Sequence, residues 1–128
     1  MTVQELNSEF GIPGKVTFYN GKGGWPYVEI SHNFSKANIS LYGAHILNFI
    51  PTDRPDLLWN THQAFFVDGK AIRGGVPVCW PWFGPHNTDN TKPAHGFGRL
   101  SFWNVLSTSI LETGDIQLSL QLNSSNKW

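Results

Sequence analysis

The sequence predicts an all-β fold, an antiparallel β-sandwich, and three observations support this expectation. Apolar and polar residues alternate along several short runs, a period typical of strands that are buried on one face. Glycine, proline and asparagine separate these runs. Helical periodicity is almost absent. Many short strands joined by turns indicate an antiparallel sandwich and not a fold in which strands alternate with helices.

The expected elements follow one another at short intervals along the chain. The first ten residues are polar with a faint helical pattern, and we expect at most one helical turn there. Strand patterns come after it, separated by turn signals such as Tyr42-Gly43 and Thr113-Gly114. The clearest alternation lies at residues 116–122, where Ile or Leu alternates with Gln or Ser. The expected strands are residues 15–19, 26–31, 37–41, 46–50, 100–110 and 116–122.

Length and charge restrict the class of protein. A chain of 128 residues is long enough for one domain with a real core. Nine Lys and Arg balance nine Asp and Glu, so no net basic field attracts nucleic acid or an anionic membrane. No run has the length of a membrane span, and the N-terminus lacks the apolar run of a signal peptide. We therefore expect a cytoplasmic protein with no nucleic-acid or membrane partner.

The candidate chemistry is concentrated in residues 71–84 and 93–99, which place Arg73, His95 and Arg99 among glycines, prolines and aromatic rings. Glycine and proline disfavour regular elements, so we expect a shaped loop, the usual location of binding sites. A short edge strand at residues 76–82 is the alternative. An arginine beside a Gly-Gly turn suits a carboxylate or phosphate. The segments together predict a pocket for a sugar that carries an anion.

Other kinds of site are less well supported. His86 and His95 lie near Asp89, but no His-X-His or His-Glu-X-X-His spacing indicates a metal site, and we expect none. The remaining histidines, which are His32, His45 and His62, are expected to be surface residues or hydrogen-bonded ones. The single Cys79 excludes an internal disulfide, and we expect a small buried hydrophobe there, not a nucleophile.

Residues 73–84, followed by His95-Gly96-Phe97-Gly98-Arg99 and Ser101-Phe102-Trp103, resemble the hexose-6-phosphate mutarotases of the aldose 1-epimerase superfamily. Gly43-Ala44-His45 and Leu58-Trp59 are similar to the family's early strands, which leaves the role of His45 open. Family members are more than twice as long as this chain. The resemblance implies that residues 1–128 form a single, incomplete domain, the N-terminal portion of a galactose-mutarotase-like supersandwich.

The resemblance implies interconversion of the α and β anomers of a phosphorylated aldohexose, such as glucose 6-phosphate, without a cofactor. A base removes the proton of the anomeric hydroxyl while an acid protonates the ring oxygen, and the opened ring recloses on the other face. In the family these groups are a glutamate and a histidine that follow the part matched here. The histidine usually follows a Trp-Pro step, and this sequence stops at Trp128. We therefore expect a binding part without its catalytic pair.

For the residues present, the resemblance assigns substrate binding to Arg73, His95 and Arg99. Ala94 replaces a glutamine found in some relatives, which leaves one polar contact open. The rings of residues 80, 82 and 83 either stack on a sugar or fill the core. A non-catalytic carbohydrate-binding or interaction module is the alternative function. Absent strands would leave sheet edges uncovered, so we expect self-association through those edges.

Overall fold

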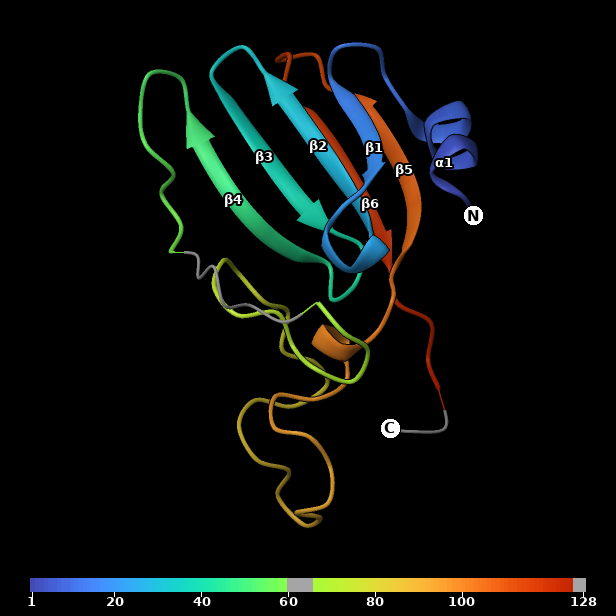
Figure 1. Ribbon diagram of the computed structural model, residues 1–128, viewed down its shortest axis with the longest axis vertical. Coiled ribbons are helices and arrows are strands. Elements are labelled where there is room, and N and C mark those ends of the chain that lie inside the picture. Colours follow the sequence, from blue (N-terminus) through green and yellow to red (C-terminus); the bar gives the residue numbers. More distant parts are fainter. Residues whose placement is uncertain (60–65, 126–128) are drawn as a thin grey trace.

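The computed structural model describes residues 1–59 and 66–125, and its strands form two antiparallel sheets above an irregular lower segment (Figure 1). In chain order the elements are α1 (Val3–Phe10), β1 (Val16–Asn20), the 3-10 helix η1 (Lys22–Gly24), β2 (Pro26–His32), β3 (Ser35–Ser40), β4 (His45–Pro51), the 3-10 helix η2 (Gly98–Leu100), β5 (Asn104–Ile110) and β6 (Ile116–Gln121). One sheet has the order β1-β2-β3-β4, and the other is the hairpin β5-β6.

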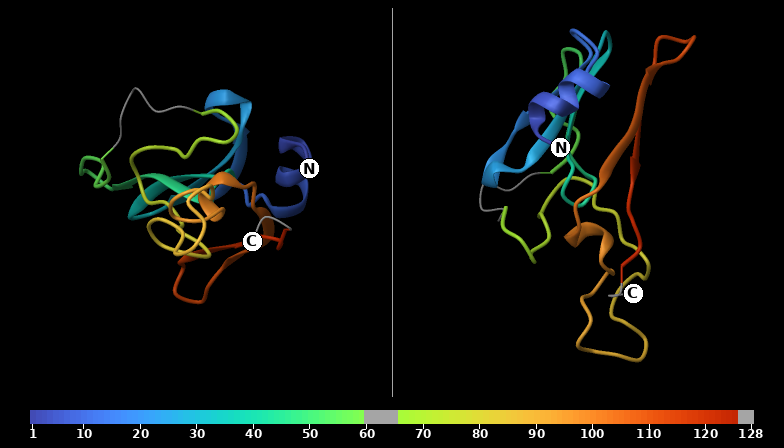
Figure 2. Two further views of the ribbon diagram at one scale, coloured as in Figure 1. Left: turned by 90° about the horizontal axis from the view of Figure 1, so that it is seen from below. Right: turned by 90° about the vertical axis from the view of Figure 1, so that its right-hand side faces the viewer.

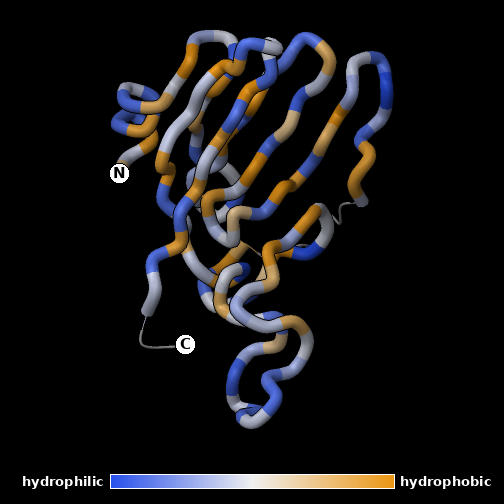
Figure 3. The backbone as a smooth tube through the Cα atoms, turned by 180° about the vertical axis from the view of Figure 1, so that it is seen from behind, coloured by the Kyte–Doolittle hydropathy of each residue, from blue (hydrophilic) through white to orange (hydrophobic). Residues whose placement is uncertain are grey.

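The two sheets enclose one apolar core. Phe18 on β1 and Val28 on β2 are 1% and 0% exposed, and Leu118 and Leu120 of the hairpin pack against this core. Figure 2 shows the hairpin as a second layer, and Figure 3 shows apolar residues alternating with polar ones along the strands. This alternation allows each strand to bury one face while the other meets solvent. The predicted all-β antiparallel sandwich is confirmed.

Each predicted strand has a counterpart, and the start of β5 differs most from the prediction. β5 begins at Asn104 because the residues before it form η2 and a short irregular connection. Trp103 fixes that connection: its amide donates to the Leu41 carbonyl at 2.9 Å, and its indole Nε1 donates to the Gly98 carbonyl at 2.8 Å. Phe102 makes only an isolated antiparallel bridge, to Tyr42, and the regular pairing of the hairpin starts at residue 104.

The N-terminal helix is longer than predicted, and the expectation of at most one turn is wrong. α1 starts at a cap in which the Thr2 hydroxyl accepts the Glu5 amide at 3.1 Å. Leu6 is buried in the core. The Asn7 side chain pairs with β1, since it donates to the Phe18 carbonyl and accepts the Phe18 amide, both at 2.7 Å. Tertiary contacts therefore stabilise a helix whose local pattern is weak.

Residues 66–103 connect the sheets and form the irregular lower segment of Figure 1. The predicted loop at residues 71–84 is confirmed, and the alternative edge strand does not form. Val76 and Trp80 make only isolated bridges, to Ile46 and Gly96 respectively. These bridges attach the loop at a few positions and leave its remaining length to adopt irregular shapes.

The aromatic rings of this loop are not core residues. Trp80 and Phe83 are 53% and 81% exposed, so the interpretation that they fill the core is wrong. Trp82 is half-buried, and its indole Nε1 donates to the Pro93 carbonyl at 2.9 Å. The rings at positions 80 and 83 thus remain accessible beside the candidate site, while Trp82 stabilises the loop.

Candidate functional site

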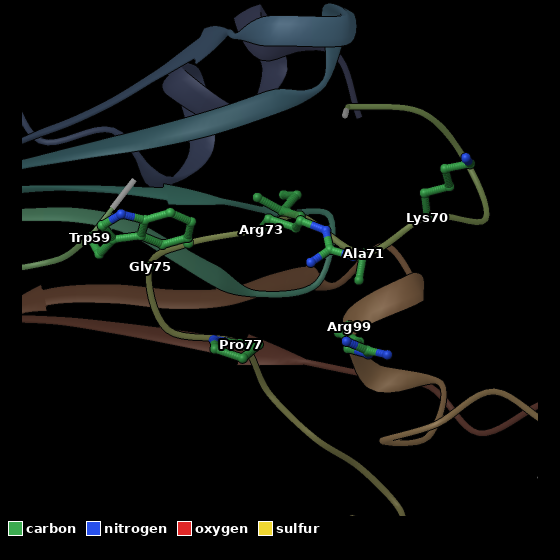
Figure 4. A pocket seen from close by; sticks show the side chains of 9 residues that line it. Trp59, Lys70, Ala71, Arg73, Gly75, Pro77 and Arg99 are labelled. Atoms are coloured by element: carbon green, nitrogen blue, oxygen red, sulfur yellow. The ribbon is translucent and has the colours of Figure 1, made fainter. Parts of the chain in front are cut away.

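A hollow of about 640 Å³ lies between the segment that follows β4 and the 3-10 helix η2 (Figure 4). Its volume is typical of pockets for small organic ligands. The residues that line it are Trp59, Lys70, Ala71, Ile72, Arg73, Gly74, Gly75, Pro77 and Arg99.

The charged residues that the structure describes in this lining are all cationic. They are Lys70, Arg73 and Arg99, and the described lining contains no aspartate or glutamate. Figure 4 shows the Arg73 and Arg99 side chains extending towards the same space from two separate segments. The whole chain has a formal net charge of zero, so the positive potential is local. Two guanidinium groups facing one space suit a phosphate or carboxylate, because each can bind such oxygens bidentately.

Arg99 has a donor that the described residues 1–59 and 66–125 do not satisfy. Its Nη2 donates to the Ala94 carbonyl at 2.8 Å, which fixes the side chain against the loop before η2. Its Nε is buried and has no hydrogen-bond partner among the described residues. A buried charged donor without an acceptor is costly.

The Gly74-Gly75 turn places Arg73 at the rim of the hollow. Gly75 has a φ of +62°, and a Cβ there would lie 2.0 Å from the Ile46 carbonyl oxygen, so only glycine fits. Its amide donates to the Trp59 carbonyl at 2.8 Å. The backbone of Val76 then exchanges two hydrogen bonds with Ile46 on β4. The turn is thus fixed to the rigid sheet, and the neighbouring Arg73 is held with it.

His45, at the start of β4, lies beneath this turn. It is 2% exposed, and its Nε2 donates to the Gly74 carbonyl at 2.5 Å, so the neutral ring has its proton on Nε2. Burial lowers the pKa of His45, while the bond to Gly74 opposes this effect in part. The expectation of a hydrogen-bonded histidine is confirmed. Its position under the loop that contains Arg73 and Gly74, the arginine loop, was not predicted, and the only sequence signal was the Gly43-Ala44-His45 segment.

His95 does not line the hollow. Its amide donates to the Gly84 carbonyl at 2.8 Å, and its Nδ1 accepts the Gly84 amide at 3.0 Å. The neutral ring therefore has its proton on Nε2, and it packs against Phe83 with the ring centroids 4.8 Å apart. Its φ of +65° is uncommon for a non-glycine residue. The structure thus brings Arg73 and Arg99 together and places His95 on an adjacent turn.

Two lining residues were not predicted from the sequence. Trp59 is 71% exposed and presents its ring at one side of the hollow, and Lys70 adds a third cation. Leu58-Trp59 was noted only as part of a resemblance, and Lys70 follows an ordinary Asp-Gly turn. Neither residue has a local pattern that distinguishes a ligand contact from a surface residue.

The histidines outside the hollow have local partners. His86 Nδ1 accepts the amides of Thr88 and Asp89 at 3.2 and 3.0 Å, which makes it part of a turn. His32 Nε2 lies 3.8 Å from a carboxylate oxygen of Asp115. His62 and Trp128 are outside the described residues.

Metal binding, membrane crossing and the single cysteine are the remaining points on which the sequence made a prediction. Among residues 1–59 and 66–125, no group of three or more His, Cys, Asp or Glu side chains is arranged to hold a metal ion. No helix in the same residues has both the length and the apolarity to cross a membrane. Cys79 is half-buried with a free thiol, so it is less buried than predicted.

The fold and the hollow together define a class: a β-sandwich protein with a cationic pocket of small-ligand size. Residues 26–128 match the family model described as aldose 1-epimerase, and the chain belongs to this family. It is 39% identical over 100 residues to a protein of Escherichia coli named "Putative glucose-6-phosphate 1-epimerase". It is 38% identical over 98 residues to a protein of the same name from Salmonella typhimurium. These matches span 78% and 77% of this chain and 33% of each relative.

A solved structure has the same fold. The crystal structure of a "putative mutarotase" from Salmonella typhimurium superposes with a TM-score of 0.81 at 31% sequence identity. The match covers 91% of this chain and 39% of that one. The chain therefore spans about a third of the length of the curated relatives it matches.

Proposed function

We propose that this chain supplies the phosphosugar-recognition part of a hexose-6-phosphate mutarotase site. The observation that supports this proposal most is the hollow in which Arg73 and Arg99 face one space without an acidic neighbour in the lining. The names of the relatives are consistent with a phosphorylated hexose. A phosphate ester carries the charge and the oxygen geometry that paired guanidinium groups bind.

The proposed binding mode assigns one role to each side chain. Arg73 and Arg99 bind phosphate oxygens through their guanidinium groups. The exposed ring of Trp59 offers an apolar face to the sugar ring. His95, on the turn before Arg99, presents an Nε2–H that can donate to a sugar hydroxyl. The orientation of the sugar is then set by its phosphate.

Anomer interconversion needs an acid and a base in addition to recognition. The ring oxygen must gain a proton and the anomeric hydroxyl must lose one, and such groups typically contribute about 10²–10⁴-fold each to the rate. Among residues 1–59 and 66–125, the lining of the hollow has no carboxylate and no histidine. We therefore assign no catalytic residue to the lining, and the mechanism requires no cofactor. We place the reaction in the cytoplasm, because charged phosphosugars do not cross bilayers readily.

A binding-only role is the second candidate function. The described part of the lining has recognition groups without an acid-base pair, and this composition suits a carbohydrate-binding or interaction module as well as a catalytic site. We also propose that residues 1–128 belong to a single β-sandwich domain, because one core joins both sheets. The proposed partners are a phosphorylated hexose and a second copy of the chain.

The test of this function measures binding and turnover separately. Calorimetry with glucose 6-phosphate should show binding that Arg73→Ala or Arg99→Ala weakens by about ten- to a hundredfold. The reason is that each variant loses a charge-assisted hydrogen bond worth about 1.5–3 kcal/mol. Arg54→Ala is the matched control, because Arg54 is exposed and outside the lining. Glucose without phosphate should bind much more weakly than the phosphate ester.

Saturation-transfer NMR of the two anomers of glucose 6-phosphate then measures turnover. Exchange above the buffer rate that is lost in Arg73→Ala supports the mutarotase, and binding without exchange supports the recognition module. Equal affinity of glucose and glucose 6-phosphate, or no effect of either arginine variant, would rule out the phosphate site proposed here.

A further inference from the structure

The two arginines of the hollow lie on separate segments, and both segments are bonded to residues 41–46. These residues connect β3 to β4 and start β4, and we call them the junction segment. At one end of it, His45 and Ile46 bond to the arginine loop. The other end contacts residues 99–103, which begin with Arg99. One short part of the larger sheet therefore carries both guanidinium groups.

The backbone after η2 lies directly against the junction segment. The Trp103 amide donates to the Leu41 carbonyl at 2.9 Å. The Gly43 amide donates to the Ser101 carbonyl at 2.7 Å. Gly43 has a φ of +81°, and a Cβ there would lie 3.0 Å from the Arg99 carbonyl oxygen, so the contact is close. Leu41 and Gly43 are buried, which makes this end of the segment a firm support.

Two side chains of the same stretch return to η2 and fix it. The Trp103 indole Nε1 donates to the Gly98 carbonyl at 2.8 Å, and the Ser101 hydroxyl donates to the Phe97 carbonyl at 2.7 Å. Gly98 is buried and immediately precedes Arg99. Trp103 thus bonds the junction segment through its backbone and η2 through its ring, so the position of Arg99 depends on it.

The position of Arg99 relative to Arg73 has a chemical consequence. Figure 4 shows the two guanidinium groups reaching one hollow from separate segments. A phosphate ester has three terminal oxygens in different directions, so it can bind both groups at once. A carboxylate has two oxygens in one plane, and a single guanidinium can bind both of them. The spacing of the two arginines should therefore affect a phosphate more than a carboxylate.

We propose that Trp103 is a positioning residue that holds Arg99 at the distance from Arg73 that a phosphate group requires. It thereby sets the preference for a phosphorylated hexose over a hexose with a carboxylate at the same carbon. Trp103 is outside the lining of the hollow, so it acts through Arg99. The inference rests on the proposed phosphosugar site, and it names the residue that gives this site its selectivity.

Replacing the indole tests this role. Trp103→Phe keeps an aromatic ring and removes the N–H that bonds to Gly98. Glucose 6-phosphate should bind about three- to tenfold more weakly, whereas glucuronate, with its carboxylate at C6, should change by less than about twofold. Ser101→Ala removes the second bond to η2 and should shift the preference in the same direction. NMR titration at constant pH and ionic strength measures all four affinities.

Two comparisons separate positioning from a general loss of stability. Thr108→Val is the matched control, because it removes a bond of 2.6 Å to the Phe10 carbonyl and Thr108 is outside the lining. It should lower the melting temperature, as Trp103→Phe does, but leave both affinities at the wild-type value. In an Arg99→Ala background, Trp103→Phe should cause no further loss of glucose 6-phosphate affinity, although it still lowers the melting temperature.

The possible failures of this inference and of the proposed function are distinguishable. Equal losses for the two anions in Trp103→Phe would overturn the positioning role, as would the same loss with and without Arg99. Wild-type affinity for glucose 6-phosphate in both Trp103→Phe and Ser101→Ala would also overturn it. In these cases the phosphate site itself would stand. Glucose 6-phosphate binding that does not depend on Arg99 would contradict the proposed function, and the inference with it.

Discussion

His45 is the single residue that connects the sheet most directly to the arginine loop. It starts β4, lies buried in the interior and donates from Nε2 to the carbonyl of Gly74, the residue after Arg73. A protonated ring would keep this donor but would add an uncompensated charge to an apolar interior. The loop is therefore held by a histidine that must stay neutral.

The stability of the chain should consequently depend on pH through His45. Its pKa in the folded state is lowered from the ordinary value of 6.5 by burial, so the unfolded chain binds a proton more readily. The stabilisation is fully present above about pH 6.5 and decreases as pH falls towards the folded-state pKa. Urea unfolding between pH 7.5 and 5 should show this loss. His45→Gln should reduce the slope and lower the stability at pH 7.5.

His86→Gln serves as the control, because in the described part of the chain the hydrogen bonds of that ring stay within its own turn. It should retain the wild-type pH slope. The same slope in His45→Gln and the wild type would mean that another group titrates over this range.

The sequence predicted some of the site residues and missed others for a physical reason. Arg73 was predictable because a guanidinium beside a Gly-Gly turn is costly to bury unpaired and suits an anion, and Arg99 was assigned through the family resemblance. Trp59 and Lys70 were not, because only the tertiary path of the loop brings them to the hollow. His95 was predicted with the arginines, yet the structure directs it to Gly84. Residue type gives the chemistry of a group, and the fold decides which groups meet.

At the level of elements, the Asn7 side chain fixes α1 to the edge of the larger sheet. The Asn7 amide makes two hydrogen bonds to the Phe18 backbone and so completes the edge of β1. An eight-residue helix is too short to be stable alone, so this docking and the burial of Leu6 are its main support.

Asn7→Ala should therefore destabilise the protein by about 2–3 kcal/mol, because it leaves a half-buried amide and carbonyl without partners. Asn7→Asp keeps the acceptor and loses the donor, so its effect should be intermediate. Urea denaturation measures both changes, and Asn87→Ala, an exposed loop substitution, should stay within about 0.5 kcal/mol of the wild type. A similar small effect for Asn7→Ala would contradict the docking role.

The elements were more predictable than the loop. Period-two alternation determines both that a strand exists and which face it buries, so all the strands were found. α1 was underestimated, because its few turns offer little periodicity and its stability comes from contacts with β1. The shape of residues 66–103 depends on isolated bridges and single hydrogen bonds such as Gly75 to Trp59, which follow no periodic pattern.

The whole molecule combines two regions of different expected stability. The sheets share one core and have regular hydrogen-bond ladders, whereas residues 66–103 have isolated bridges and one short 3-10 helix. Regions with few regular backbone bonds open at lower free energy than the core. The site thus lies on the less stable region and is oriented by the more stable one.

Hydrogen exchange should resolve these two regions and test the site at the same time. Amides of β1, β2 and β3 should exchange slowly, and most amides of residues 66–103 should exchange quickly. A ligand that binds only the closed hollow stabilises it by about 2.7 kcal/mol at a concentration of 100 Kd. Saturating glucose 6-phosphate should therefore slow exchange by up to about a hundredfold at residues 70–77 and 94–100, with little change in the strands. Arg99→Ala should remove this protection but keep the slow exchange of the sheet. Protection of the strands alone would show that the ligand binds elsewhere, because the hollow is the place where the loop can gain order from a bound phosphate.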